Sequence, residues 1–481
     1  MVFRHGKALR LLAVITALAA LFALVSCAGT EKPDASPDPS ATPGGNARYT
    51  ADGRRIITIG TFQDIYYVSK HDSIYADPYV PVINGDEDEE ALAEKRRFID
   101  TAEMKLAKLR EIELKYNVVI EYKNLTFNGV MESVNTSIAE GVPDVDVYQV
   151  DTQFGVPAVL NGLGSALEDF LPADSAIFGG TGAVKGLKLT GQDKTYLFNA
   201  AKSGGTSAYP LAFNLDLILA AGLENPQDLY DRGEWTWDVW RQYLRTLTTH
   251  MNAAGVADFY GYGGYWTNML SNLLMSNGAS VAAGETQTFD SEPTREVLDF
   301  INALYNTDRT ARPWYGPNWE LNNRLYTEGL SGFWIAADWI FSEQGGADLP
   351  FEIGVVPWPA GPSGNPATNN YSAPDSTWFM IPQGAEDPAL IYAVLDEWLD
   401  WYGGDDSVVT DDWSRNMYMN ERNFGYAAMM SARQGFDLWD SLSKPINFSI
   451  TEMLDGLATP EEIIDKFAPM FQAELDEYFG N

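Results

Sequence analysis

Hydrophobic and polar positions alternate in blocks along the first part of the chain, and these blocks predict strands and helices in turn. A β-branched run over 56–59 stops at Gly60 and predicts a strand. Apolar residues at helical spacing among charged ones predict a long amphipathic helix over 89–116. Short apolar runs over 118–120 and 145–150 predict two further strands.

The order of these blocks predicts a parallel sheet with crossover helices. Val130, Val134 and Ile138 fall on one face of a second predicted helix, which Gly141 and Pro143 end. A strand–helix–strand–helix–strand order is typical of an open α/β sheet. Ligands of such sheets bind beyond the carboxyl ends of the strands.

Polar side chains come after two of these strand ends and are candidate ligand-binding residues. Asp64 comes after the first strand, and Asp151 and Gln153 come after the third. Carboxylates and amides can fix the orientation of a polar ligand by hydrogen bonds. The alternative for Asp151 is a buried cap of the next helix.

The later pattern predicts more of the same architecture. Residues 371–382 are expected to be extended, and 389–401 are expected to form a helix with Ile391, Leu395 and Trp398 on one face. More than four hundred residues lie beyond position 55, which is too long for one hydrophobic core. The chain is therefore expected to fold as an α/β protein with two lobes.

The N-terminal segment has the pattern of a secretory signal. Basic residues precede an apolar run over 11–25, which is shorter than the roughly 20 residues that a membrane-spanning helix needs. The run ends at Ser26 and Cys27, and residues 24–27 resemble a lipobox, in which the cysteine is acylated after cleavage. We expect a signal peptide over 1–26 and lipidation of Cys27. An ordinary signal peptide with an incidental cysteine is the alternative.

Residues 27–54 are expected to form a disordered linker behind the lipid anchor. Proline, serine, aspartate, threonine and glycine dominate its first part, without apolar periodicity. Cys27 is the only cysteine of the 481 residues, which excludes disulfides and cysteine metal clusters within the chain.

Charge and composition narrow the possible functions. The formal net charge is −35, and such a field repels nucleic-acid backbones, so no nucleic-acid partner is expected. The sequence has three histidines, of which one lies in the predicted signal peptide. It shows no phosphate loop, zinc-ligand spacing or nucleophile elbow, so neither a cofactor nor a metal nor enzymatic activity is predicted.

Several segments, in order along the chain, resemble the extracellular solute-binding proteins of family 1, the ligand receptors of ABC sugar importers, related to maltose-binding protein. The similar segments are Gly141–Val145, Tyr209–Asn214, Ala221–Pro226, Trp235–Asp238, Gly329–Trp339 and Ile353–Pro357. No single segment is decisive, but the ordered set covers nearly the whole chain after the linker.

The resemblance implies two discontinuous α/β lobes with a ligand cleft between them. The first lobe would hold 55–201 with 369–402, and the second would hold 202–368 with 403–481. Hinge rotation would close the lobes on a ligand. The expected function is capture of a carbohydrate, with an oligosaccharide favoured, by a monomer that docks on the transmembrane subunits of an ABC permease. The expected place is the extracellular face of the cell membrane, or its periplasmic side in a Gram-negative cell.

Aromatic residues make up 13% of the chain and supply candidate sugar-stacking rings. Trp266 comes after a glycine- and tyrosine-rich stretch, and Trp339 comes after a predicted strand; the resemblance places both at the cleft. Tyr371 and Asp375 are weaker candidates. Core packing is the alternative for each tryptophan.

Two other classes of function remain open from the sequence. A surface-anchored glycoside hydrolase needs only two suitably spaced carboxylates, and the chain has 67 acidic residues. A carbohydrate-binding sensor or adhesin would keep the lobes but lack a permease partner. Release of reducing ends from oligosaccharides would distinguish the hydrolase from a binding protein.

Overall fold

The computed structural model describes most of the chain beyond the predicted signal peptide. The described residues are 48–62, 73–76, 80–83, 89–188, 193–202, 209–249, 257–314, 324, 328–336, 349–371, 377–409, 415, 417–433, 442–443 and 445–479. The predicted lipidation site Cys27 lies outside them.

Three parallel strands form one side of the first sheet, as the hydrophobic pattern predicts. They are β2 (Arg55–Thr61), β3 (Val118–Asn124) and β4 (Val147–Asp151). β2 pairs with β3 along its whole length and with β4 near its carboxyl end. The crossover helices are α3 (Glu89–Tyr116) and α4 (Phe127–Ser137). The observed bounds of α3 are those of the helix predicted over 89–116.

The remaining strands make the first sheet mixed rather than wholly parallel. β13 (Thr377–Met380) lies between β4 and β6 (Leu197–Ala200) and is antiparallel to both. β5 (Val184–Leu187) forms the edge beside β6. Because β13 comes more than 170 residues after β6, the sheet is assembled from distant parts of the chain, as the discontinuous lobes require.

The predicted linker is too long at its carboxyl end. Its last residues form β1 (Arg48–Tyr49), which pairs antiparallel with β2 through a turn. Thr50 closes this turn by accepting a hydrogen bond from the Arg54 backbone N–H at 3.0 Å. The folded part therefore begins at Arg48. Composition alone does not reveal these hairpin hydrogen bonds.

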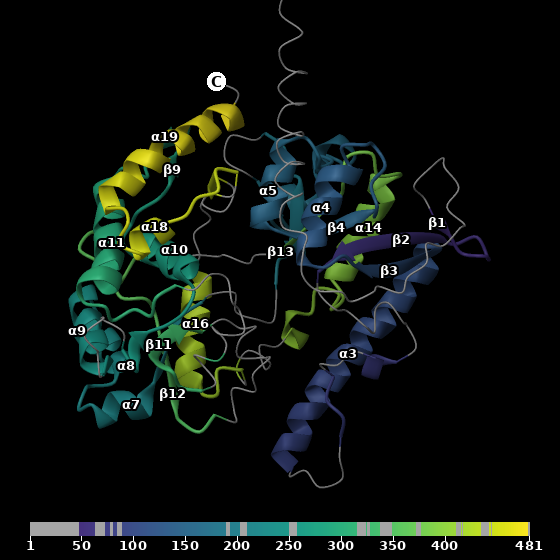
Figure 1. Cartoon of the computed structure of the whole chain (residues 1–481). Coiled ribbons are helices and arrows are strands. Elements are labelled where there is room, and N and C mark those ends of the chain that lie inside the picture. The colour runs from purple at the N-terminus through teal and green to yellow at the C-terminus, as the bar shows by residue number, and fades with distance from the viewer. Residues whose placement is uncertain are drawn as a thin grey trace, which may run out of the picture. The chain divides into compact units, whose positions relative to one another are not determined.

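Helices cover both faces of the first sheet (Figure 1). On one face, Ile57 and Ile59 pack with α3 and with α14 (Pro388–Leu399). On the other face, Tyr148 and Val150 pack with α4 and with α5 (Thr152–Leu160). Within β4, Val147 enters the first of these cores and Tyr148 the second, which is the pattern of a strand buried on both faces.

The second sheet has four strands in the order β12-β7-β11-β8. They are β7 (Leu211–Asn214), β8 (Tyr260–Tyr262), β11 (Ser331–Ile335) and β12 (Ile353–Val356). β8 and β11 are parallel, whereas β7 runs antiparallel to β11 and β12. The C-terminal helices α16 (Glu421–Ala432), α18 (Thr451–Leu454) and α19 (Pro460–Phe479) share the core of this sheet.

Shorter elements complete the described part of the chain. The helices are η1 (Ile74–Ala76), η2 (Leu167–Asp169), α6 (Ala176–Gly179), α7 (Leu215–Ala220), α8 (Pro226–Asp231), α9 (Trp237–Leu247), α10 (Trp266–Ser276), α11 (Glu292–Asn302), η3 (Ala303–Thr307) and η5 (Asp406–Val408). β9 (Ala282–Ala283) and β10 (Thr286–Gln287) form a small hairpin.

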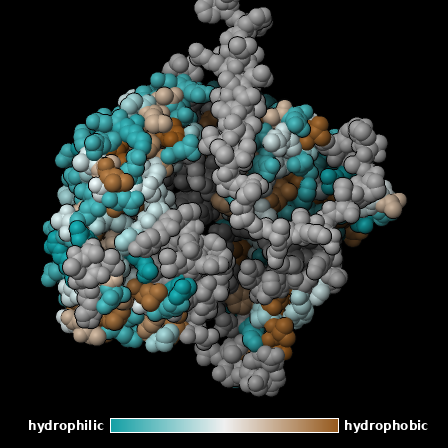
Figure 2. All heavy atoms as spheres, viewed as in Figure 1, coloured by the Kyte–Doolittle hydropathy of each residue, from teal (hydrophilic) through white to brown (hydrophobic). Residues whose placement is uncertain are grey.

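The coloured part of the surface in Figure 2 is mostly polar. On the face drawn in Figure 2, hydrophobic residues form small patches separated by hydrophilic ones. Within the described ranges, no helix has the length and hydrophobicity needed to cross a membrane.

Candidate ligand-binding site

Three strands of the first sheet end side by side, which is where an open α/β sheet binds its ligand. β2 ends at Thr61, β3 at Asn124 and β4 at Asp151. Thr61 Oγ1 donates a hydrogen bond to Gln149 Oε1 at 2.5 Å, and both side chains are buried. This edge therefore combines hydroxyl, amide and carboxylate groups.

Asp151 takes the capping role that was the alternative to ligand binding. Its side chain is 2% exposed, and Oδ1 accepts a hydrogen bond from the Phe154 backbone N–H at 3.0 Å. The capped helix is α5, which begins directly after β4. The cap explains why this carboxylate tolerates burial, and its contact with a ligand stays a prediction.

Three phenylalanines lie just beyond the carboxyl ends of these three strands. Phe62 comes directly after β2, Phe127 begins α4, and Phe154 lies in the first turn of α5. The ring centroids of Phe62 and Phe127 are 5.3 Å apart, and those of Phe127 and Phe154 are 4.8 Å apart. Sequence analysis missed this row, although each phenylalanine lies within three residues of a strand end.

The second sheet also presents polar and aromatic groups at the carboxyl end of β8. Tyr262 ends β8, and Ala311 forms a parallel bridge with it. The backbone N–H of Arg312 donates to the Tyr262 carbonyl at 2.9 Å, which fixes Arg312 at this end of the sheet. Burial raises the pKa of the Tyr262 phenol well above its usual value, so it stays neutral.

Arg312 comes two residues before Trp314, whose half-buried ring lies beside that of Tyr265. Tyr265 and Trp314 have centroids 6.1 Å apart. Arg312 Nε is buried and has no hydrogen-bond partner in the described part of the chain. A buried N–H without a partner lowers the stability of the folded protein. A ligand that accepts a hydrogen bond from this guanidinium would therefore bind more tightly.

Trp266 is the first residue of α10 rather than part of the loop before it. Its side chain is 6% exposed and belongs to the second core, with its ring centroid 6.5 Å from that of Phe448. This environment favours the core-packing alternative, and ligand stacking by Trp266 stays a prediction.

Tyr371 is also deeply buried, at 1% exposure. Its backbone N–H donates to the Arg433 carbonyl at 3.1 Å, and burial raises the pKa of its phenol. Asp64, Trp339 and Asp375 lie outside the described residues, as does the side chain of Gln153. Their roles stay predictions.

Among the residues that the model describes, no cluster of three or more histidine, cysteine, aspartate or glutamate side chains could hold a metal ion. The groups at the carboxyl ends of the strands in the two sheets are rings, hydroxyls, amides, the Asp151 carboxylate and a guanidinium. Such groups bind and orient a polar ligand by stacking and hydrogen bonds.

Solved structures with the same fold are numerous but distant in sequence. An ABC substrate-binding protein from Listeria monocytogenes in complex with cycloalternan is 15% identical, with 88% of this chain and 99% of that chain covered and a TM-score of 0.59. A maltose/maltodextrin-binding domain from Bdellovibrio bacteriovorus bound to maltotriose is 13% identical, with coverages of 87% and 99% and a TM-score of 0.54.

A protein from Mycobacterium tuberculosis in complex with glycerophosphocholine is 14% identical, with 79% of this chain and 95% of that chain covered and a TM-score of 0.54. Curated proteins gave no match to the sequence. Residues 103–408 match the sequence profile of the bacterial extracellular solute-binding proteins, and this chain belongs to that family.

Proposed function

We propose that this chain captures a carbohydrate outside the cell and delivers it to the membrane subunits of an ABC importer. The observation that carries the solute-binding role is the family match over residues 103–408. The carbohydrate class is supported by the rings beside hydrogen-bonding groups at both sheet edges. Two solved structures with this fold hold cycloalternan and maltotriose, while a third holds glycerophosphocholine.

The second sheet supplies the most specific support for a carbohydrate. Tyr265 and Trp314 offer aromatic surface for the C–H face of a sugar ring, and Arg312 offers donors to its hydroxyl oxygens. The glycoside hydrolase alternative is not favoured, because the family is one of binding proteins. A sensor or adhesin would bind the same ligand but would not support its uptake.

Capture would result from lobe closure around the ligand. The chain passes from the first sheet to the second between β6 and β7, returns between β12 and β13, and leaves again between α14 and α16. The lobe bounds expected from the resemblance need two changes, because β1 joins the first sheet and Tyr371 packs in the second core. We propose a first lobe of 48–201 with 377–402 and a second of 202–371 with 403–481. A ligand held by both lobes would favour the closed state by its extra contacts.

A lipid on Cys27 would hold the receptor near its permease. The support is the lipobox-like tetrapeptide over residues 24–27 and the proline-rich segment behind it. A flexible segment of roughly 20 residues reaches about 25 Å on average, which lets the folded part stand clear of the bilayer.

A thermal-shift panel tests the proposed ligand class. Maltotriose, cellotriose, xylotriose and their monosaccharides would be compared with amino acids, a tripeptide and glycerophosphocholine. We expect a sugar to raise the melting temperature, because a ligand at a hundred times its Kd stabilises the folded state by about 2.7 kcal/mol. Stabilisation by glycerophosphocholine or a peptide alone would contradict the carbohydrate assignment.

A further inference from the structure

Phe127 is an aromatic side chain held in place yet left open to solvent. Its ring contacts that of Phe62 edge-on, at an interplanar angle of 84°, and that of Phe154 at 54°. Phe154 is 8% exposed, whereas Phe127 is 44% exposed. A single exposed apolar residue is ordinary, but this ring is held by two neighbouring rings and so offers a fixed aromatic surface for contact.

The segment before Phe127 is fixed by close contacts with the strand end beside it. The Leu125 backbone N–H donates to the Thr61 carbonyl at 2.8 Å, and the Leu125 side chain lies over Gly60. A Cβ at Gly60 would come within 2.7 Å of Leu125 Cδ1 and 2.9 Å of Val145 Cγ2, so a larger residue there would displace the Leu125 side chain. The start of α4 is therefore anchored to the carboxyl end of β2.

Thr126 adopts a backbone conformation that residues other than glycine rarely adopt. Its φ of 63° and ψ of 163° lie in a region that is almost reserved for glycine. Its N–H donates to Asn124 Oδ1 at 2.9 Å, and its Oγ1 accepts from the Gly129 N–H at 3.3 Å. Strain of this kind persists where surrounding contacts impose it, and such residues concentrate at ligand sites.

These observations converge on one place and one chemistry. The anchored loop and the strained Thr126 fix Phe127 at the edge where β2, β3 and β4 end. We infer that Phe127, supported by Phe62 and Phe154, is a stacking platform for one sugar ring of the ligand. This inference rests on the proposed carbohydrate-binding function and adds a subsite on the first lobe.

Calorimetric titration of the tightest-binding sugar of the panel tests the platform. Phe127→Ala and Phe127→Leu should each weaken binding by about tenfold or more, because both remove the aromatic face. Phe127→Tyr keeps the face and should bind within about threefold of the wild type. Met131→Ala is the matched control: Met131 is a similarly exposed apolar residue one turn along α4, and its loss should leave the Kd unchanged.

The outcomes separate this inference from the proposed function. Equal Kd values for the wild type and Phe127→Leu would overturn the platform while leaving carbohydrate binding intact. An equal loss in Met131→Ala would also overturn it, because the effect would then belong to α4 as a whole. Failure of the wild type to bind any sugar would overturn the proposed function and the platform together. The melting temperature of each unliganded variant shows whether it is folded.

Discussion

At the scale of single residues, backbone strain at Thr126 makes a prediction about stability. Thr126→Gly should raise the free energy of unfolding by about 1 kcal/mol. The substitution relieves about 1–3 kcal/mol of backbone strain. This gain outweighs the loss of the helix cap and the greater conformational freedom of glycine in the unfolded chain. Urea unfolding measures the change. Thr136→Gly, within the same helix at a helical backbone conformation, should instead destabilise the protein.

Residue types alone predicted some roles at this scale and not others. Asp151 could be assigned either a cap or a ligand contact, because both need a short carboxylate after a strand; the structure shows the cap. Trp266 is preceded by glycines and tyrosines, but its burial depends on contacts with Phe448, nearly two hundred residues later. The row that contains Phe127 depends on three strand ends meeting, which no single segment reveals.

At the scale of elements, a buried amide network joins α8, β12 and α16. Gln227 Nε2 donates to the Val355 carbonyl and to Asn423 Oδ1, both at 2.8 Å. Asn423 Oδ1 also accepts from the Val355 N–H at 2.9 Å, and its Nδ2 donates to the carbonyls of Ile353 and Tyr418. Because Gln227 and Asn423 are buried, the network holds α16 on the second sheet.

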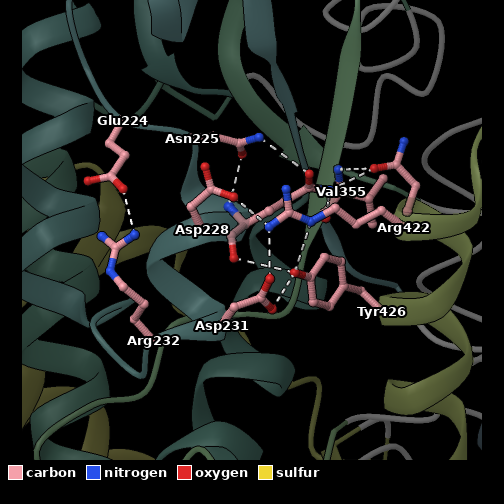
Figure 3. Close-up of polar contacts among 10 residues, drawn as sticks. Glu224, Asn225, Asp228, Asp231, Arg232, Val355, Arg422 and Tyr426 are labelled. Carbon is pink, nitrogen blue, oxygen red and sulfur yellow. Dashed lines mark hydrogen bonds and ion pairs between the residues drawn. The ribbon is translucent and has the colours of Figure 1, made fainter.

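Replacing Asn423 by Leu should therefore be strongly destabilising. It leaves several buried donors and acceptors without partners, at a cost of about 3 kcal/mol in the free energy of unfolding. Arg422→Ala is the neighbouring control: Arg422 pairs with Asp228 and Asp231 at the surface, so its loss should cost less than about 1 kcal/mol (Figure 3). Equal losses would show that the buried network contributes no more than the surface pairs.

The segment that carries Arg312 is held to α9 by Asp308. Arg241 and Arg245 both pair with this buried carboxylate. Burial alone would raise the pKa of Asp308, but hydrogen bonds from the two arginines lower it overall. A lowered folded-state pKa means that the stabilisation is present above the unfolded pKa and is lost as the pH falls through the folded pKa.

Asp308→Asn should accordingly lower the free energy of unfolding at pH 7 by about 1–3 kcal/mol. The difference from the wild type should shrink as the pH falls below about 4, where the carboxylate begins to take up its proton. Urea unfolding at several pH values measures it, with Asp299→Asn as an exposed control expected to change little. A difference that does not vary with pH would contradict the ionic account.

Element patterns were the part of the fold most readily predicted from the sequence. The 28 residues of α3 carry a regular apolar spacing, and β2, β3 and β4 are short β-branched or apolar runs. β1 escaped prediction because two residues carry no periodicity and depend on pairing with β2. The place of β13 could be expected only from the family resemblance, because its neighbours β4 and β6 are distant in sequence.

At the scale of the whole molecule, the lipid anchor is separable from ligand binding. Cys27→Ser removes the only thiol, so we expect released protein in the medium or an uncleaved precursor in the membrane. Cell fractionation measures this. Ligand affinity of the released protein should be unchanged, because the proposed binding groups begin beyond Arg55. Retention of a correctly cleaved serine variant at the membrane would place the anchor elsewhere.

The central claim is that this protein binds a carbohydrate through groups at the carboxyl ends of its strands. Calorimetric titration of the wild type and of Arg312→Ala tests this claim most directly. The wild type should bind one equivalent of a panel sugar saturably, and Arg312→Ala should bind the same sugar about tenfold or more weakly, since its charge-assisted donors are lost. Arg312→Ala should keep its melting temperature, because the buried Nε has no hydrogen-bond partner among the described residues to leave behind. No heat of binding from any sugar, with saturable binding of a peptide or of glycerophosphocholine, would contradict the account.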